Sequence, residues 1–257
     1  MAAAPPLTNW SEKSRVCIAN LQTFHWDPQD LSEFPIASLA AVLVLLYEDS
    51  GTLRVLLTTR SKELRTHAGQ TALPGGRVDT SDNGITDTAL REAYEEVDLP
   101  LGNKDVHPFA IMDPFLSLHR LIVTPVVAVL TNLSILDQLK PSASEVANIF
   151  NHPLEALLDP NLAHGENLVA RKSEDWPYET ELHDTTDSIM PLLGSTPYRM
   201  HRFRSSASPI KGLTADILIR VAEVAYGRAP VYDRYAPNQI RGWPAVKRVA
   251  FNSDSVS

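Results

Sequence analysis

The segment from Gly75 to Leu99 constrains the fold most, because it joins a Gly-Gly loop to an amphipathic helix within one short stretch. Residues 85–97 carry Ala89, Ala93 and Val97 at four-residue spacing, which gathers small apolar side chains on one helical face. Small side chains let a helix lie close to the layer that it covers. The segment therefore predicts a helix packed tightly against a sheet.

Three apolar runs can supply strands for that sheet: residues 40–47, 53–59 and 121–130. Nearly continuous apolar runs are typical of strands that are buried on both faces. Residues 48–52 contain Asp, Ser and Gly, which favours a hairpin between the first two runs. Residues 214–226 predict a second helix, since their apolar side chains share one face and a glycine follows them.

From these elements we expect one mixed α/β domain at residues 36–227. An N-terminal arm (residues 1–35) precedes it, and an irregular C-terminal tail (residues 228–257) follows it. Within the domain, residues 144–159 predict a short helical or turn-rich segment. Residues 160–196 are polar and rich in turn-forming residues, and their sequence predicts no regular element.

Charge and cysteine content exclude several classes of protein. The chain has 23 Lys and Arg against 31 Asp and Glu, a net charge of −8, which disfavours binding along nucleic-acid phosphates. Cys17 is the one cysteine, so neither an internal disulfide nor a multi-cysteine metal site can form. The longest apolar stretch, residues 36–47, is too short to span a membrane.

The two ends of the chain guide the expected compartment. Residues 1–7 lack the positive flank and the long apolar run of a signal peptide. Residues 255–257 differ from a peroxisomal Ser-Lys-Leu ending. We therefore expect a cytoplasmic protein, and we keep the peroxisome as the alternative.

The predicted helix also carries three carboxylates at positions i, i+3 and i+4, namely Glu92, Glu95 and Glu96. This spacing puts them on one side of the helix, where they repel one another unless a positive charge lies nearby. Hard cations such as Mg²⁺ or Mn²⁺ bind carboxylate oxygens and leave positions for substrate phosphates. The alternative is a solvated acidic face, with Arg91 in a surface ion pair.

The stretch from Gly76 to Leu99 resembles the Nudix box. That pattern is Gly, five residues, Glu, seven residues and then Arg-Glu-U-x-Glu-Glu-x-Gly-U, where U is apolar. The resemblance implies a Nudix-type α/β/α sandwich with a mixed sheet, in which the box forms a loop, a helix and a loop. The matching positions in this chain are Gly76, Arg91, Glu92, Ala93, Glu95, Glu96 and Leu99.

The chain departs from the general box in three places. The interval from Gly76 to Arg91 is one residue longer, Asp82 is the nearest residue to the early Glu, and Asp98 replaces the late Gly. A glycine just past a helix end usually has positive φ, and Asp tolerates that conformation better than most residues. We expect Asp98 to cap the helix in this way. The alternative is that the box geometry has relaxed in a chain that has left the ancestral reaction.

Residues 56–76, LLTTRSKELRTHAGQTALPGG, are similar to the upstream signature of the coenzyme A diphosphatase branch of Nudix hydrolases. That branch also has the longer interval and an Asp in the early part of the box. Leu73 stands where the branch usually has an aromatic residue. The resemblance extends over roughly residues 40–227, which is most of the chain.

The resemblance implies roles for individual residues. We expect Glu92, Glu95 and Glu96 to bind Mg²⁺ or Mn²⁺ ions, and Arg91 to be structural. The expected catalytic carboxylates are Glu92, Glu95 and Glu145, with Glu92 or Glu145 as the base. The expected substrate-binding residues are Arg60, Arg65, Gly75 and Gly76. The alternatives are surface ion pairs for the two arginines and a helix-start acid for Glu145.

The implied function is a metal-dependent diphosphatase that hydrolyses coenzyme A or acyl-CoA to 3′,5′-ADP and 4′-phosphopantetheine. One alternative is the same chemistry on ADP-ribose, a dinucleotide or a prenyl diphosphate, and another is a non-hydrolytic Nudix binding module. The expected partner is a small-molecule diphosphate, and we expect neither nucleic acid nor membrane binding. The arm and the tail could form dimer contacts, so a homodimer is kept open.

Overall fold

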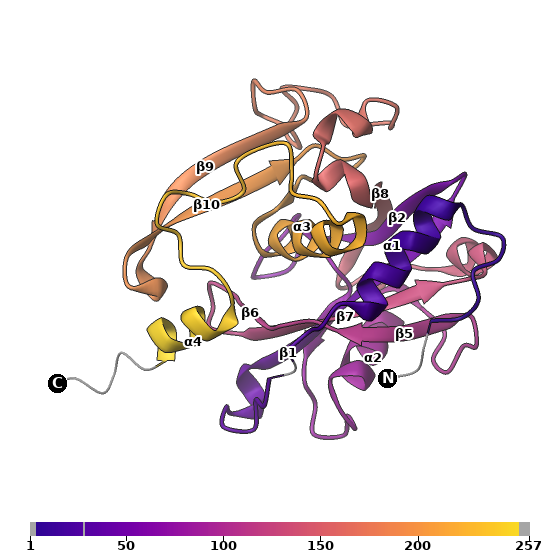
Figure 1. Ribbon diagram of the computed structural model, residues 1–257, viewed down its shortest axis with the longest axis horizontal. Helices are drawn as coiled ribbons and strands as arrows, with labels where there is room; N and C mark the ends of the chain where they lie inside the picture. The colour runs from indigo at the N-terminus through magenta and orange to yellow at the C-terminus, as the bar shows by residue number, and fades with distance from the viewer. Residues whose placement is uncertain (1–3, 28, 252–257) are drawn as a thin grey trace.

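The computed structural model describes residues 4–27 and 29–251, which build a mixed sheet between helices (Figure 1). The strands of the main sheet are β1 (Leu39–Asp49), β2 (Thr52–Arg60), β3 (Thr71–Ala72), β4 (Gly75–Arg77), β5 (Val106–Ile111), β6 (Phe115–Leu116), β7 (Ile122–Leu130) and β8 (Val146–Pro153). A smaller sheet contains β9 (His183–Met190), β10 (Thr196–Phe203) and β11 (Ile210–Lys211). The α-helices are α1 (Glu12–Thr23), α2 (Ile85–Val97), α3 (Gly212–Tyr226) and α4 (Trp243–Phe251), and the 3₁₀ helices are η1 (Ile36–Ser38), η2 (Leu133–Gln138), η3 (Leu154–Leu157), η4 (Pro160–Ala163) and η5 (Pro191–Leu193).

The helices form a layer on each face of the main sheet. On one face α2 presents Ala89, Ala93 and Val97, all fully buried, to alternate residues of β1 and β7. On the other face α1 and α3 pack against each other and over the remaining apolar residues of the same strands (Figure 1). Because β1 and β7 pair in parallel while the other pairs are antiparallel, the sheet is mixed. The predicted α/β/α sandwich is thereby confirmed.

Strands β1 and β2 pair only near their hairpin and then splay apart. Their register runs from Asp49↔Thr52 to Leu46↔Val55. Beyond that point, the segment from residue 71 to residue 77 fills the wedge between them: β3 pairs with β2, and β4 pairs with β1. This arrangement places the Gly-Gly loop in the middle of the sheet, directly over helix α2.

Two strands lie in segments for which the sequence predicted a different structure or no regular element. Strand β8 lies in the segment predicted as helical or turn-rich, and it pairs with β2 along nearly its whole length. Strand β9 lies in the segment predicted to have no regular element, and it pairs with β10. Most residues of β9 are exposed and polar, so the strand lacks the alternation of a half-buried strand. It is a strand because its backbone pairs with that of β10.

Two helices occur in the flanking segments. In the arm, Ser11 caps α1 by accepting a hydrogen bond from Ser14 N, and one side of this helix is buried on α3. In the segment predicted as an irregular tail, α4 forms and buries Trp243, so that prediction is wrong over Trp243–Phe251. Three prolines mask the helical period of this region in the sequence. The division into arm, domain and tail stays a prediction.

Within residues 4–27 and 29–251, the structure contains no helix with the length and apolar character needed to span a membrane. The interpretation of residues 255–257 lies outside the described residues, and that of residues 1–7 lies partly outside them, at residues 1–3.

Candidate active site

The Gly-Gly loop forms a cradle in which side chains are sterically excluded. A Cβ atom added to Gly75 would lie 2.3 Å from Ala41 O, and one added to Gly76 would lie 2.4 Å from Glu92 Oε2. Gly75 requires glycine, because the atoms in the way belong to the backbone and its φ is 157°, whereas a side chain at Gly76 would have to displace the carboxylate of Glu92. The absence of side chains lets the carboxylate of Glu92 lie directly against the backbone of β4.

Glu96 is the most deeply buried of the three box glutamates, with 5% of its side chain exposed. Its Oε2 accepts a hydrogen bond from Gly75 N at 3.1 Å, and its Oε1 lies 3.8 Å from Arg60 Nη1. Burial, helped by the charges of Glu92 and Glu145, raises the pKa of Glu96 to about 7. The Gly75 amide and Arg60 only partly offset these effects. The site therefore holds more negative charge than the protein compensates.

Arg91 organises the acidic residues at the start of the site. Its guanidinium group donates to both oxygens of Asp82, from Nε at 2.8 Å and from Nη2 at 3.0 Å. Its Nη1 donates to Glu92 Oε1 at 2.8 Å and lies 3.3 Å from the carboxylate oxygens of Glu95. This bidentate pair holds the pKa of Asp82 well below its usual range. Asp82 is thus the acid that anchors Arg91 in this chain.

The remaining two carboxylates are more accessible. Half of the Glu95 side chain is exposed, and Arg91 is its contact within the site. Glu145 is exposed on the turn before β8, and two backbone hydrogen bonds tie this turn to the site: Ser61 N donates to Glu145 O, and Ser142 N donates to Glu96 O. Glu145 therefore lies in a turn and does not start a helix. The charge of Glu145 raises the pKa values of Glu92 and Glu96, so the three carboxylates belong to one electrostatically coupled site.

The two arginines predicted to bind substrate differ in position. Arg60 lies at the end of β2 beside Glu96, and its buried Nε has no hydrogen-bond partner among the described residues. Arg65 is exposed on the following loop and, within the part of the chain that the structure describes, forms no hydrogen bond or ion pair with the cluster. The structure therefore brings Arg60 to the carboxylates but leaves Arg65 apart, and its substrate role stays a prediction.

The donor atoms of this site suit a hard divalent cation. Glu92 and Glu96 are largely buried carboxylates with raised pKa values, which indicates uncompensated negative charge. Within residues 4–27 and 29–251, however, no three His, Cys, Asp or Glu side chains converge closely enough to hold a metal ion. The reason is Arg91, which contacts Glu92 and Glu95 while Glu96 is turned toward Gly75. An ion held by all three would compete with Arg91.

Asp98 adopts the conformation expected for the missing glycine. It caps α2 with φ 58° and ψ 32°, in the left-handed region, and its N–H donates to Tyr94 O at 2.9 Å. Leu99 N in turn donates to Ala93 O at 3.3 Å, which completes a Schellman-type helix end. The helix therefore ends in the usual way despite the substitution, and this gives no support to a relaxed box.

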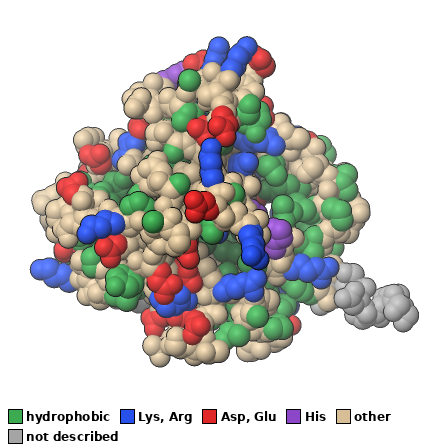
Figure 2. All heavy atoms as spheres, turned by 180° about the vertical axis from the view of Figure 1, so that it is seen from behind, with side chains coloured by type: hydrophobic (Ala, Val, Ile, Leu, Met, Phe, Trp, Pro, Cys, Tyr) green, Lys and Arg blue, Asp and Glu red, His purple; other side chains and the backbone are tan. Residues whose placement is uncertain are grey.

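Sequence reasoning missed the polar residues on the far side of the molecule, because nothing in their spacing joins them. Tyr198 Oη donates to Asp216 Oδ2 at 2.7 Å, and His183 Nε2 lies 3.0 Å from His201 Nδ1. These pairs arise from contacts of β10 with α3 and β9. Figure 2 shows basic and acidic side chains interspersed on the face that it displays, in keeping with a chain that offers no broad basic surface there.

The comparisons with known proteins agree with this geometry. The sequence model of the family described as "NUDIX domain" matches residues 37–172, just over half of the chain. Nudix hydrolase 22, chloroplastic, of Arabidopsis thaliana is 39% identical over 200 residues, which are 77% of this chain and 59% of that protein. This chain thus spans less than two thirds of the length of that relative.

Two further relatives carry a substrate in their names. The peroxisomal coenzyme A diphosphatase ndx-8 of Caenorhabditis elegans is 38% identical over 170 residues, 64% of this chain and 70% of that protein. The peroxisomal coenzyme A diphosphatase NUDT7 of Mus musculus is 28% identical over 192 residues, 75% of this chain and 72% of that protein. Together with the match to the family and the mixed sheet over α2, these similarities show that the chain belongs to the Nudix family.

Proposed function

We propose that the protein hydrolyses the diphosphate bond of a small molecule, with Mg²⁺ or Mn²⁺ held by Glu92, Glu95 and Glu96. The observation that carries this proposal is the pair of buried carboxylates, Glu92 and Glu96, that lie against a side-chain-free backbone with raised pKa values. A purely structural acidic face would be solvated, and its carboxylates would be paired. Here the carboxylates are buried and only partly compensated.

When bound, a divalent cation supplies charge neutralisation for the diphosphate and acidifies a coordinated water. The chain's own residues then have separate tasks. Arg60 offers a guanidinium group beside Glu96, suited to a phosphate oxygen. Arg91 holds Glu92 and Glu95 in place through Asp82. Glu145, which is exposed to solvent, or Glu92 accepts the proton of the attacking water.

For the substrate we propose coenzyme A or an acyl-CoA, cleaved to 3′,5′-ADP and 4′-phosphopantetheine. The support is the similarity to two proteins named as coenzyme A diphosphatases, together with the residues 56–76 described above. The chain is at least as similar to a relative named only as a Nudix hydrolase. Another nucleoside or metabolite diphosphate is therefore the competing outcome of the experiment.

The test is product analysis by mass spectrometry after incubation with Mg²⁺ and then Mn²⁺. The panel contains coenzyme A, an acyl-CoA, ADP-ribose, NADH and a prenyl diphosphate. Release of 3′,5′-ADP from coenzyme A supports the proposed substrate. Loss of this release in Glu96→Gln, with release retained in Arg171→Glu, supports the proposed metal site. Arg171 is exposed on the loop before β9, so its variant controls for a change of charge.

Other outcomes correct the proposal in defined ways. Cleavage of a different panel member keeps the chemistry and replaces the substrate. Full activity in Glu96→Gln overturns the assignment of the metal ligands. No cleavage by folded, metal-supplied protein overturns the proposed substrates and favours a non-hydrolytic binding module. The cytoplasmic location and a homodimer stay predictions beside this proposal.

A further inference from the structure

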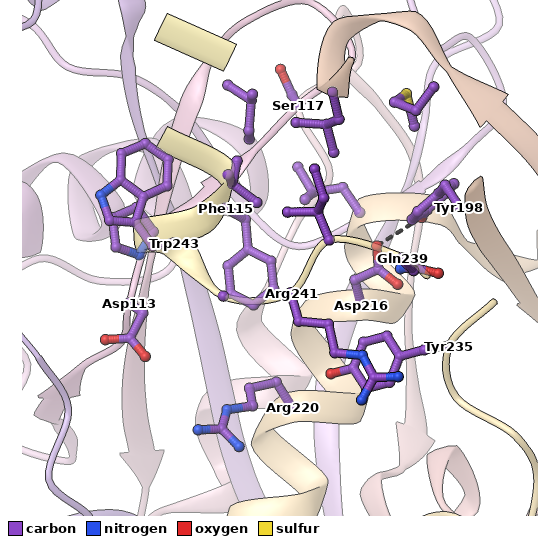
Figure 3. A pocket seen from close by; sticks show the side chains of 18 of the residues that line it. Asp113, Phe115, Ser117, Tyr198, Asp216, Arg220, Tyr235, Gln239, Arg241 and Trp243 are labelled. Atoms are coloured by element: carbon purple, nitrogen blue, oxygen red, sulfur yellow. Dashed lines mark hydrogen bonds between the residues drawn. The ribbon is translucent and has the colours of Figure 1, made fainter. Parts of the chain in front are cut away.

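A cavity of about 600 Å³ lies between the Nudix core and the C-terminal elements (Figure 3). Its walls come from the loop around β6, from β9 and β10, from the start of α3 and from α4. None of the carboxylates of the candidate active site lines it. The volume is within the range of small-molecule sites, roughly 300–1,000 Å³. Much of this wall follows residue 172, where the family match ends.

The cavity is separated from the active site by the width of the sheet. At one level of the sheet, Arg77 of β4 pairs with Ala40, Ala40 with Val123, and Val123 with Phe115 of β6. Three inter-strand spacings of about 4.8 Å put the two ends of this row about 14 Å apart. Phe115 also packs into the core on the face of α1 and α3, whereas the box carboxylates belong to α2 on the other face. The cavity is therefore a second site.

The inside of the cavity is mainly apolar and adaptable. Phe115 and Leu213 line it, together with the thioether side chains of Met112 and Met200. Methionine side chains adjust to the shape of an apolar ligand. Trp243 is buried in this wall, and its Nε1 has no hydrogen-bond partner among the described residues. A buried donor without a partner is unfavourable, so an acceptor atom on a ligand would stabilise the site.

The charges around the cavity indicate which ligand it suits. Arg234 is neutralised by an ion pair with Glu223. Arg220 has its nearest carboxylate oxygen on Glu223 at 3.9 Å, beyond hydrogen-bond distance, and instead lies over the Trp26 ring. Arg241 lies over the Tyr235 ring at 4.2 Å and forms no ion pair with any described residue. Figure 3 shows both guanidinium groups at the lower margin of the cavity.

The carboxylate of Asp216 would repel a negative charge placed deep inside the cavity. Its Oδ2 accepts the hydrogen bond of Tyr198, and the residue lines the wall near the first turn of α3. A ligand that fills the cavity should therefore be apolar inside and place its negative charge near the arginines. We propose that this cavity binds an amphipathic anion, with an apolar chain or ring inside and a carboxylate or phosphate on Arg220 and Arg241.

The experiment is isothermal titration calorimetry on the full chain in the presence of a metal chelator. The probes are decanoate, decyl phosphate, decanol and decyltrimethylammonium, which share one apolar chain and differ in head group. We expect one-to-one binding of at least one anion, at least tenfold tighter than binding of the alcohol or the cation. The preferred anion then distinguishes a carboxylate ligand from a phosphate ligand. Because no metal or turnover is involved, failure of the proposed function would leave this result unaffected.

Two variants at exposed positions separate the charge from the apolar contact. Arg241→Glu should weaken binding of the preferred anion at least tenfold and leave decanol binding unchanged, because Arg241 is exposed at the mouth. Leu118→Asp should weaken binding of both, since Leu118 lines the cavity and is 60% exposed. Arg171→Glu, outside the cavity, should change neither. The proposal is overturned if no anion binds, if the cation binds equally well, or if Arg241→Glu has no effect.

Discussion

The active site and the second cavity lie next to the same sheet, yet they differ in how they are built. The active site takes most of its polar groups from residues between Arg60 and Glu96, on one loop and one helix, and adds Glu145 from the turn before β8. The cavity takes its walls from residues as distant as Trp26 and Val246. The first concentrates buried charge against a bare backbone, and the second concentrates apolar surface with charges at its margin. A short motif can encode the first, whereas only the folded chain assembles the second.

The largest expected effect comes from removing the buried charge of Glu96 in the active site. Glu96→Gln should lower diphosphate hydrolysis about 1,000-fold, because an electrostatic group at the reacting centre is typically worth 10²–10³-fold. Asp216→Asn, which changes a carboxylate of the cavity, should leave the rate within about twofold. Steady-state rates of both variants on the cleaved substrate measure the difference. Equal losses in both variants would contradict two independent sites.

Next in size is the stability that Arg91 provides. Arg91→Ala leaves the carboxylate of Asp82, 4% exposed, without its bidentate partner. Breaking a buried pair from one side costs about 3 kcal/mol or more of unfolding free energy. Arg199→Ala removes a similar bidentate pair with Asp187, but 44% of that side chain is exposed, so the loss should be much smaller. Urea denaturation of the two variants gives the comparison, and similar midpoints would show that Asp82 is not effectively buried.

The sequence allowed the active-site side of this comparison to be predicted in some detail. The spacing of Ala89, Ala93 and Val97 predicted the buried face of α2, and Asp98 was expected in the conformation that it adopts. These features depend on neighbours along the chain, which a sequence displays directly. The wedge between β1 and β2 could not be predicted, because it depends on where two strands cease to pair.

The cavity side could not be predicted, for a related reason. Strand β9 is a strand because β10 pairs with it, and its exposed polar residues carry no period of their own. Helix α4 is held by contacts such as that of Phe251 with Phe34, more than two hundred residues away in the chain. Arg65 shows that prediction from sequence is limited even within a motif. It belongs to the signature of residues 56–76, yet the fold leaves it apart from the carboxylates. Long-range packing decides each of these cases.

A pH titration tests the cavity side more finely. Burial raises the pKa of Asp216 from 3.8 to about 6, so the folded protein holds this proton at a pH where the unfolded chain has released it. Stability contributed by this group should therefore fall as pH rises from about 4 through the folded pKa to about 7, and stay constant above that. The difference in unfolding free energy between the wild type and Asp216→Asn should change across this window by about 3 kcal/mol. Parallel stability curves would show that Asp216 keeps an ordinary pKa.

The smallest expected effect lies at the end of the box helix, and it tests whether the active site is intact. Asp98 has a left-handed conformation that glycine adopts without steric cost, and its negative charge lies at the carboxyl end of α2, where the helix dipole disfavours it. Asp98→Gly should therefore stabilise the protein by up to about 1 kcal/mol. Its rate of hydrolysis should stay that of the wild type, because Asp98 already closes the helix with the hydrogen bonds of a Schellman-type end. A rate that rises tenfold or more in Asp98→Gly would mean that Asp98 holds the box carboxylates out of position, and would favour the relaxed box over a tolerated helix cap.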